Sequence, residues 1–226
     1  MTRKFLLSSI AFVCVGCVAF LARAWWLEPA SPGETTAAKA VEIARITDRR
    51  ISEASGIVAS RTFAGVYWTH NDGDDNHLFA IARDGSVVGT AKLDANVHDW
   101  EDIAIDEFGG LYVADTGNNS GARKHLEVHR LREPDPEHLS GKKIRTLRLS
   151  DTWHVRFPAE PFNCESLFVW KDSCYLIAKS PPGMKADVYR FDLKQNDPTL
   201  EKVATLPIDQ PVTAADLSAD GVVGHL

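Results

Sequence analysis

The sequence predicts an all-β fold, and three observations support this prediction. Short runs rich in Val, Ile, Leu, Tyr and Trp alternate with turns rich in Gly, Asp, Asn and Pro. No long amphipathic helix is evident after the N-terminal region. One hairpin pattern also recurs three times, starting at Ala54 (ASGIVASRTFAGVYWTHN), Glu101 (EDIAIDEFGGLYVADT) and Glu165 (ESLFVWKDSCYLIAKS). Each copy has an apolar strand, a tight polar turn and a second apolar strand that ends in a polar residue.

Each hairpin is followed by two further strand-like segments, so the repeating unit has four strands. These segments are His77–Ala82, Ser86–Leu93, His125–Leu131, Ile144–Leu149, Asp187–Leu193 and Glu201–Pro207. Equivalent positions in the successive units are Ser55, Asp102, Ser166 and Asp216, at intervals of roughly 45 to 65 residues. Four short strands in a unit of about this length are typical of a β-propeller blade. We therefore predict a partial β-propeller, with about three four-stranded blades and the start of a fourth at Ala215–Ser218. The alternative is a chance similarity between hairpins of another β fold.

Residues 1–27 are predicted to be a signal peptide or a membrane anchor. Arg3 and Lys4 provide a positively charged start, and the following run to Ala22 is uncharged and apolar. Ala22 and Ala24 form a small-x-small cleavage site, whereas an uncleaved run of this length can span a bilayer as a helix. Cys17 offers a lipoprotein alternative with a poorer motif. In each case we expect an exported protein of the cell envelope, either membrane-anchored and facing the periplasm or secreted after cleavage near Ala24.

Residues 28–40 are predicted to be a flexible linker, because they are rich in Pro, Ala, Thr and Gly and lack apolar periodicity. Residues 41–226 then form the incomplete propeller domain. Within it, Val41–Ile46 is predicted to be a lone strand that pairs with a missing final blade. Glu133–Lys143 is predicted to be a polar surface loop. Because a propeller ring typically closes with about four to eight blades, we expect the chain to be a piece of a longer protein.

The charge balance argues against nucleic acid as a partner. The chain has 25 Lys and Arg residues against 31 Asp and Glu residues, for a formal net charge of −6. A domain of this charge repels a phosphate backbone. The membrane is expected to be contacted only through the N-terminal segment.

Two cysteines, Cys164 and Cys174, lie in the predicted domain. An oxidising compartment would permit a disulfide between them. Their places in the hairpin do not set them opposite each other, so two buried free thiols are the preferred interpretation.

The motifs SGIVAS (55–60), THND (69–72), DWEDIA (99–104), DTGNN (115–119), NCESL (163–167) and AKSP (178–181) stand at the hairpin ends. In these motifs the sequence resembles a family of uncharacterised exported bacterial β-propeller proteins. The general sequence pattern is similar to that of NHL-type and phytase-like propellers. The resemblance covers roughly residues 45–220. It implies the fold more than an activity, because propellers host many unrelated functions.

Charged residues recur at the ends of the repeated strands. Glu101 and Glu165 precede the first strands of their units, and His70, Asp115 and Lys179 follow second strands. Because a hairpin of short strands brings its start and end to one edge, we expect these side chains to share one mouth of the central channel. The candidate channel site is His70, Asp72, Glu101, Asp102, Asp115, Glu165 and Lys179. The alternative is a solvated channel in which Lys179 only neutralises the acids.

Two loops near this mouth, residues 71–76 (NDGDDN) and 115–119 (DTGNN), are rich in oxygen ligands. Ca²⁺ prefers six to eight oxygens in flexible geometry, so the sequence suggests a calcium site formed by Glu101, Asp115, Asn118 and Glu165. The alternative is that Asp, Asn and Gly build turns, which is their commonest use. Zinc is not expected, because the histidines lack paired spacing.

Two classes of function remain open. The first is a binding or scaffold module of the cell envelope that presents the channel mouth to an unknown small ligand or envelope protein. The second is a calcium-dependent hydrolase of the phosphoesterase or lactonase type, suggested by fold-level analogy alone. Binding is favoured because the sequence contains no G-x-S-x-G elbow, no phosphate-binding Gly loop and no recognisable Cys/His pair.

Overall fold

The computed structural model describes residues 41–218, 224 and 225. These residues form an all-β structure with one short 3-10 helix, η1 (Pro136–Leu139). The strands all lie within one compact unit, Glu42–Leu226. Within the described part, no helix has the length and apolar character needed to span a membrane. The predicted signal or anchor helix and the predicted linker at 28–40 lie outside the described residues.

The first repeat folds into a sheet of antiparallel strands that gains a fifth, parallel strand. Its order is β1 (Ala54–Ala59), β2 (Val66–Asn71), β3 (His77–Ala82), β4 (Val87–Leu93) and β8 (Arg145–Leu147). Only the β4–β8 pair is parallel. The turn between β3 and β4 contains Gly85 at φ 85°, a conformation that favours glycine.

The second and third repeats each fold into a four-stranded antiparallel sheet. The second contains β5 (Trp100–Ile105), β6 (Gly110–Asp115), β7 (His125–Arg132) and β9 (Asp151–Arg156). The third contains β10 (Cys164–Trp170), β11 (Ser173–Ala178), β12 (Ala186–Asp192) and β13 (Glu201–Leu206). A short ladder of β14 (Asp216–Leu217) and β15 (Gly224–His225) follows at the predicted fourth start.

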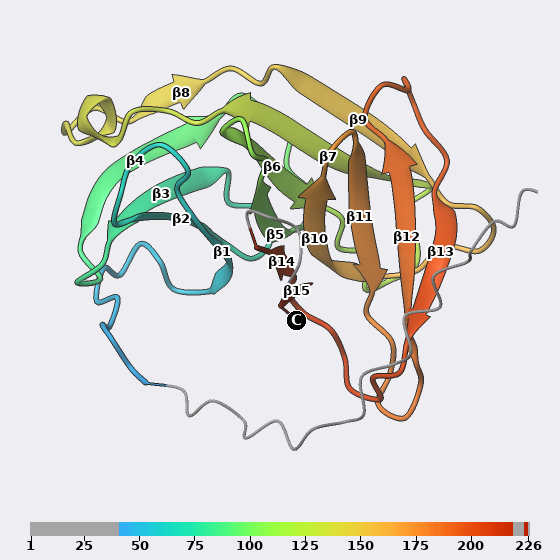
Figure 1. Cartoon of the computed structure of the whole chain (residues 1–226). Coiled ribbons are helices and arrows are strands. Elements are labelled where there is room, and N and C mark those ends of the chain that lie inside the picture. The colour runs from blue at the N-terminus through green and yellow to red at the C-terminus, as the bar shows by residue number, and fades with distance from the viewer. Residues whose placement is uncertain (1–40, 219–223, 226) are drawn as a thin grey trace, which may run out of the picture. The chain divides into compact units, whose positions relative to one another are not determined.

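The sheets are arranged in a propeller-like way, with the first strand of each sheet innermost. Strand β5 contacts both β1 and β10, and β10 contacts β14 (Figure 1). Successive side chains of a strand point to opposite faces, so the second sheet packs on both of its neighbours. In β7, for example, Leu126 and Val128 join the core toward the third sheet, whereas Leu131 joins the core toward the first. The fold is therefore compatible with a partial propeller, as the repeats predict.

Polar side chains join the innermost strands of neighbouring sheets. Ser55 Oγ donates to the carbonyl oxygen of Glu101 at 2.5 Å. Asp102 Oδ2 accepts from the backbone N–H groups of Leu167 at 2.8 Å and Ala215 at 3.1 Å. Ser55 and Asp102 occupy equivalent positions in the first two repeats, and both connect neighbouring sheets. Ser166, the equivalent residue of the third repeat, has a buried hydroxyl without a hydrogen-bond partner among the described residues.

The prediction that Ile144–Leu149 is the outer strand of the second unit is wrong. Part of this segment is β8, which pairs with β4 of the first sheet, and Leu147 and Leu149 pack on that sheet's core. The outer strand of the second sheet is β9, which the sequence analysis did not assign. Its alternation buries Trp153 and Val155 toward the third sheet.

Val41–Ile46 was predicted to pair with a final blade. Residues 41–48 have no ladder partner among the described residues, so that pairing stays a prediction. Glu133–Lys143 is more than a polar surface loop. It contains η1, whose Leu139 is buried against β4, and its Glu133 accepts from Trp68 Nε1 at 2.7 Å. Cys164 and Cys174 are both free and buried, as preferred from the sequence.

Candidate functional site

The repeat architecture brings the start of each first strand beside the end of the second strand. The register pairs Ala54 with Asn71, Trp100 with Asp115 and Cys164 with Ala178. We call this end of the three sheets the site edge. Glu101 and Glu165 directly follow paired residues at this edge, and Lys179 directly follows the last residue of β11. The register of each hairpin therefore places these residues at the site edge of their sheets.

Three carboxylates converge at the site edge. Oxygen atoms of Asp72, Asp99 and Glu101 all lie within 4.8 Å of one another. Asp72 is exposed and Asp99 is half-buried, whereas Glu101 is only 3% exposed. No carboxylate of this set forms a hydrogen bond or ion pair with another described residue. We refer to Asp72, Asp99 and Glu101 as the carboxylate cluster.

Gly117 allows the loop after β6 to lie directly against this cluster. A Cβ atom at Gly117 would overlap Asp99 Oδ2 and Glu101 Oε1. Any residue with a side chain would therefore displace the two carboxylates or the loop. The loop path is held by a backbone hydrogen bond from Gly117 N to the carbonyl oxygen of Asp99 at 3.1 Å.

Glu165 lies beside the cluster but already has a partner. Its Oε1 accepts from Lys179 Nζ and from Asn163 Nδ2, the second at 3.1 Å. Asn163 also reaches the β6–β7 loop, where it donates to Asn119 Oδ1 at 3.0 Å. Lys179 therefore pairs directly with Glu165, and it acts on Glu101 only through its charge, without an ion pair to the cluster.

Burial is the largest cause that raises the pKa of Glu101, to about 8. The charges of Glu165, Asp72 and Asp99 raise the pKa further, and Lys179 opposes them. The pKa of Asp99 is also raised, first by burial and then by Asp72 and Asp115. Negative charge at the cluster is thus left without sufficient positive charge nearby.

Asp115 has a different environment from its predicted partners. It is fully buried and accepts from the backbone N–H groups of His98 at 2.8 Å and Asp99 at 3.0 Å, and from Arg123 Nη1 at 2.8 Å. Burial alone would raise the pKa of Asp115, but His129, Arg123 and these N–H groups lower it well below its usual range. Asp115 therefore orients the loop that carries Asp99.

Asn118 likewise holds the β6–β7 loop. Its Oδ1 accepts from the backbone N–H of Arg123 at 3.0 Å, and its own N–H donates to Asn163 Oδ1 at 2.7 Å. The side chain is buried. Of the four predicted calcium ligands, the structure places Glu101 in the carboxylate cluster, pairs Glu165 with Lys179, and engages Asp115 and Asn118 in loop contacts.

His70 is completely buried beside Trp100. Its Nδ1 donates to the carbonyl oxygen of Asn71 at 2.8 Å, and its ring meets the Trp100 ring edge-on at 5.7 Å. Burial lowers the pKa of His70 to about 4, so the ring is neutral at physiological pH. His70 therefore supports the strand ends as a packed, uncharged side chain.

Asp102 faces the neighbouring inner strands rather than the carboxylate cluster. Besides the two contacts between sheets, its Oδ1 accepts from the backbone N–H of Ile103 at 2.9 Å. Burial raises its pKa to about 7, against the effect of the three N–H donors. Its role in this structure is to connect strands.

Asp99 was not among the predicted site residues, although it belongs to the DWEDIA motif. The signal was the Asp-x-Glu spacing of Asp99 and Glu101, which places two side chains on one side of an extended segment. Asn163 and Arg123 were not predicted either. Their positions depend on how the 116–123 loop folds, and the repeat pattern does not specify that loop.

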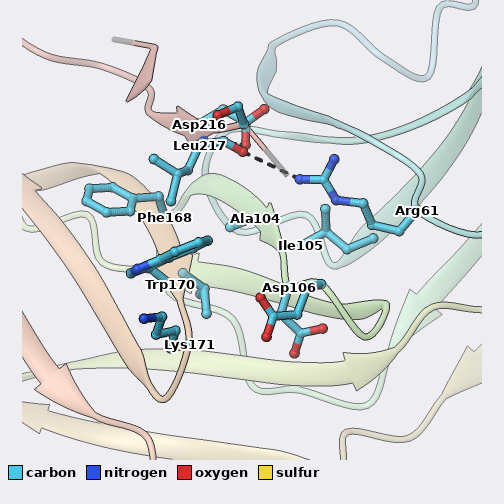
Figure 2. A pocket seen from close by; sticks show the side chains of 12 residues that line it. Arg61, Ala104, Ile105, Asp106, Phe168, Trp170, Lys171, Asp216 and Leu217 are labelled. Atoms are coloured by element: carbon cyan, nitrogen blue, oxygen red, sulfur yellow. Dashed lines mark hydrogen bonds between the residues drawn. The ribbon is translucent and has the colours of Figure 1, made fainter. Parts of the chain in front are cut away.

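A hollow lies at the end of β5 and β10 that is opposite to the site edge (Figure 2). It is lined by Arg61, Asp106, Phe168, Trp170 and Leu217, among others. Arg61 donates to the carbonyl oxygen of Leu217 at 3.4 Å. Asp106 accepts from two backbone N–H groups and from the Tyr112 hydroxyl. Because these charged groups serve contacts of the fold, we take the site edge as the candidate site.

No protein-family model matches the sequence, and a search of curated proteins found no relative. Solved structures with a similar fold include Kuenenia stuttgartiensis hydrazine synthase, with 15% identity and a TM-score of 0.41, covering 78% of this chain and 42% of that chain. Another is an auxiliary nutrient binding protein from Bacteroides thetaiotaomicron, with 11% identity and a TM-score of 0.43, covering 76% of this chain and 35% of that chain. A third is a chain of the mitotic checkpoint complex, with 16% identity and a TM-score of 0.39, covering 76% of this chain and 45% of that chain. The chain thus spans less than half the length of each. Similarity at this level does not identify a function.

Proposed function

We propose that this chain is part of an exported or membrane-anchored binding module of the cell envelope, and that its carboxylate cluster binds Ca²⁺. The observation that carries the proposal is the state of Glu101. Its carboxylate is 3% exposed, receives no hydrogen bond from another described residue, and lies within 4.8 Å of two more unpaired carboxylates. A buried carboxylate without a donor or counter-charge is costly, and a bound cation removes that cost.

The ligand set favours Ca²⁺ over a transition metal. Asp72, Asp99 and Glu101 offer only carboxylate oxygens, which are ligands for hard cations. Asp72 and Asp99 are accessible to solvent, so water or an anionic group of a ligand would complete the coordination shell. The bound ion would then present positive charge at the site edge, where a small ligand or an envelope protein would dock. Residues 1–27 would supply the export signal or anchor.

The hydrolase alternative has one supporting feature, which is again Glu101. A carboxyl group with a pKa of about 8 is suited to general acid–base catalysis near neutral pH. The proposal of binding is preferred because the described side chains around the cluster offer no activated nucleophile. A calcium-dependent hydrolysis assay with p-nitrophenyl phosphate and with a simple lactone separates the two.

The test of binding is calcium-dependent thermal stabilisation of the purified chain and of Glu101→Gln. For the unmodified chain, saturation about 100-fold above Kd corresponds to about 2.7 kcal/mol and a clear rise in Tm. Glu101→Gln keeps the shape but removes the charge. Without Ca²⁺ this variant should melt at a higher temperature than the unmodified chain, because repulsion is relieved, and Ca²⁺ should raise its Tm little or not at all.

The matched control is Glu160→Gln, the same change at an exposed position outside the cluster. It should keep the full calcium response. If Glu101→Gln responds to Ca²⁺ as strongly as Glu160→Gln, the carboxylate cluster is not the calcium site. If the unmodified chain hydrolyses either substrate in a calcium-dependent way that Glu101→Gln abolishes, the hydrolase alternative replaces the binding proposal.

A further inference from the structure

A second group of metal-binding side chains lies on the outer strands of the second sheet. His125 and Glu127 project from β7, and His154 projects from β9. The register sets Glu127 directly opposite His154, and His125 lies two residues from Glu127 on the same face. One nitrogen of each histidine and one Glu127 oxygen all lie within 4.8 Å of one another. None of these residues belongs to the carboxylate cluster.

The row of side chains along β7 changes character from one end of the strand to the other. Leu131 is 1% exposed and packs in the core toward the first sheet. On the same face, His129 is 2% exposed and Glu127 is 8% exposed, and the His125 side chain is 50% exposed. The three metal-binding groups therefore stand where this face emerges to solvent. A metal ion and its remaining water ligands have access there.

The distances match ligands that share one ion. Glu127 Oε1 lies 3.3 Å from His154 Nδ1 and 3.6 Å from His125 Nε2. Two ligands bound tetrahedrally to Zn²⁺ at about 2.0–2.2 Å are about 3.3–3.5 Å apart. Neither contact has hydrogen-bond geometry, and the two imidazole rings stand edge-on with centroids 5.5 Å apart. The three atoms thus converge at ligand spacing without bonding to one another.

A buried histidine behind the group provides an independent indication. His129 Nε2 lies 3.7 Å from Glu127 Oε2 and has no hydrogen-bond partner among the described residues. Its Nδ1 meets Thr152 Oγ1 at 3.1 Å. The second oxygen of Glu127 therefore lies near a buried ring nitrogen, which is also 3.9 Å from Asp115 Oδ2. Such outer partners of a ligand are typical of metal sites.

We propose that His125, Glu127 and His154 form a binding site for a divalent transition metal ion, with Zn²⁺ as the best fit. Two imidazoles and one carboxylate suit zinc, with water in the fourth position. A neighbouring group, His98, Asp115 and Glu127, also has the required proximity. Asp115 already accepts from His98, Asp99 and Arg123, so it is less free to bind an ion.

The experiment is a titration of the full chain, purified without a histidine tag, with ZnCl₂ in competition with a chromophoric chelator. We expect one Zn²⁺ bound per chain at this site, and an at least tenfold weaker affinity in His125→Gln and in His154→Gln. Both side chains are about half exposed, so the variants should keep the fold, which thermal melting verifies. Imidazole nitrogen resonances should shift for His125 and His154 when zinc is added.

The matched control is His138→Gln, an exposed histidine outside the group. It should bind zinc as the unmodified chain does, and so should Glu101→Gln. The proposal is overturned if zinc does not bind saturably, or if the double variant His125→Gln/His154→Gln binds it unchanged. Loss of zinc binding in Glu101→Gln alone would assign the ion to the carboxylate cluster instead. Because the calcium test uses other residues, either proposal can fail without the other.

Discussion

Glu101 and Asp102 are adjacent carboxylates whose surroundings give them different roles. Asp102 accepts three backbone N–H groups and thereby connects β5, β10 and the segment before β14. Glu101 is equally buried, yet its carboxylate has like charges nearby and no donor among the described residues. A buried acceptor that is fully bonded stabilises the fold, whereas one left without partners destabilises it unless a ligand intervenes.

The raised pKa of Glu101 predicts a pH dependence in calcium-free buffer. Its folded-state pKa of about 8 exceeds the ordinary value of 4.5, so the folded protein binds the proton more tightly than the unfolded chain does. The stabilisation is fully present below the ordinary pKa and is lost as the pH rises toward and through 8. We expect the free energy of unfolding to fall between pH 5 and 8.

Denaturant unfolding of the unmodified chain and of Glu101→Gln at several pH values checks this prediction. The difference should be clearest between pH 7 and 8, since Asp102, with a pKa of about 7, contributes mainly below that range. If the free energy of unfolding has the same pH dependence in both proteins, Glu101 is not the titrating group.

The candidate site could be predicted from the sequence only where the repeats determine it. Glu101, Glu165 and Lys179 stand at repeated positions, and the hairpin register brings them to one edge. Asp99 lies in a loop whose path depends on hydrogen bonds to buried Asp115, which no local pattern reveals. Zinc was not expected from the sequence because the histidines lack the usual paired spacing, and this reasoning passed over a local signal on β7. His125, Glu127 and His129 alternate along β7, and this period places them on one face of a strand.

At the scale of elements, the hairpins follow from local sequence but the outer strands do not. When two antiparallel strands are joined by a short turn, the residues of the strands and the turn are enough to predict that they pair. The parallel pairing of β4 with β8 joins segments more than fifty residues apart and depends on tertiary packing. The apolar pattern of Ile144–Leu149 is compatible with an outer strand of either the first or the second sheet. By contrast, the alternation of exposed and buried residues in β9 is a local signal for a strand. It was passed over because the apolar segment just before it was assigned as the outer strand.

The segment Glu133–Lys143 provides a test of that packing. Leu139 of η1 is 3% exposed and belongs to the core of the first sheet, although its surroundings in the sequence are polar. Leu139→Ala should lower the free energy of unfolding by about 2–3 kcal/mol, because a buried leucine leaves a cavity. Met184→Ala is the control, since this side chain is 59% exposed and should have little effect. Equal stability of the two variants would show that η1 does not contribute to the core.

At the scale of the whole described domain, stability depends on the junctions between sheets. The cores lie between adjacent sheets and include residues of both, so the sheets should unfold together rather than one at a time. At the junction between the first two sheets the backbones approach each other closely. Ser55 donates across it to the Glu101 carbonyl oxygen, and the next residue, Gly56, approaches the backbone of β5 directly.

Gly56→Ala should disrupt this junction. A Cβ atom there would lie 2.5 Å from Asp102 Oδ1, 2.6 Å from Ile103 N and 2.9 Å from Asp102 Cα. Backbone atoms cannot move aside as a flexible side chain can, so β1 and β5 must separate, and Asp102 would be shifted from its contacts with the third sheet. We expect a loss of about 3 kcal/mol or more in the free energy of unfolding, with a broader thermal transition. Gly141→Ala is the control, because a Cβ atom at that position meets nothing within 4 Å. If Gly56→Ala melts as cooperatively and at the same temperature as Gly141→Ala, the sheets are not joined by this close approach, and their stability must arise within each sheet separately.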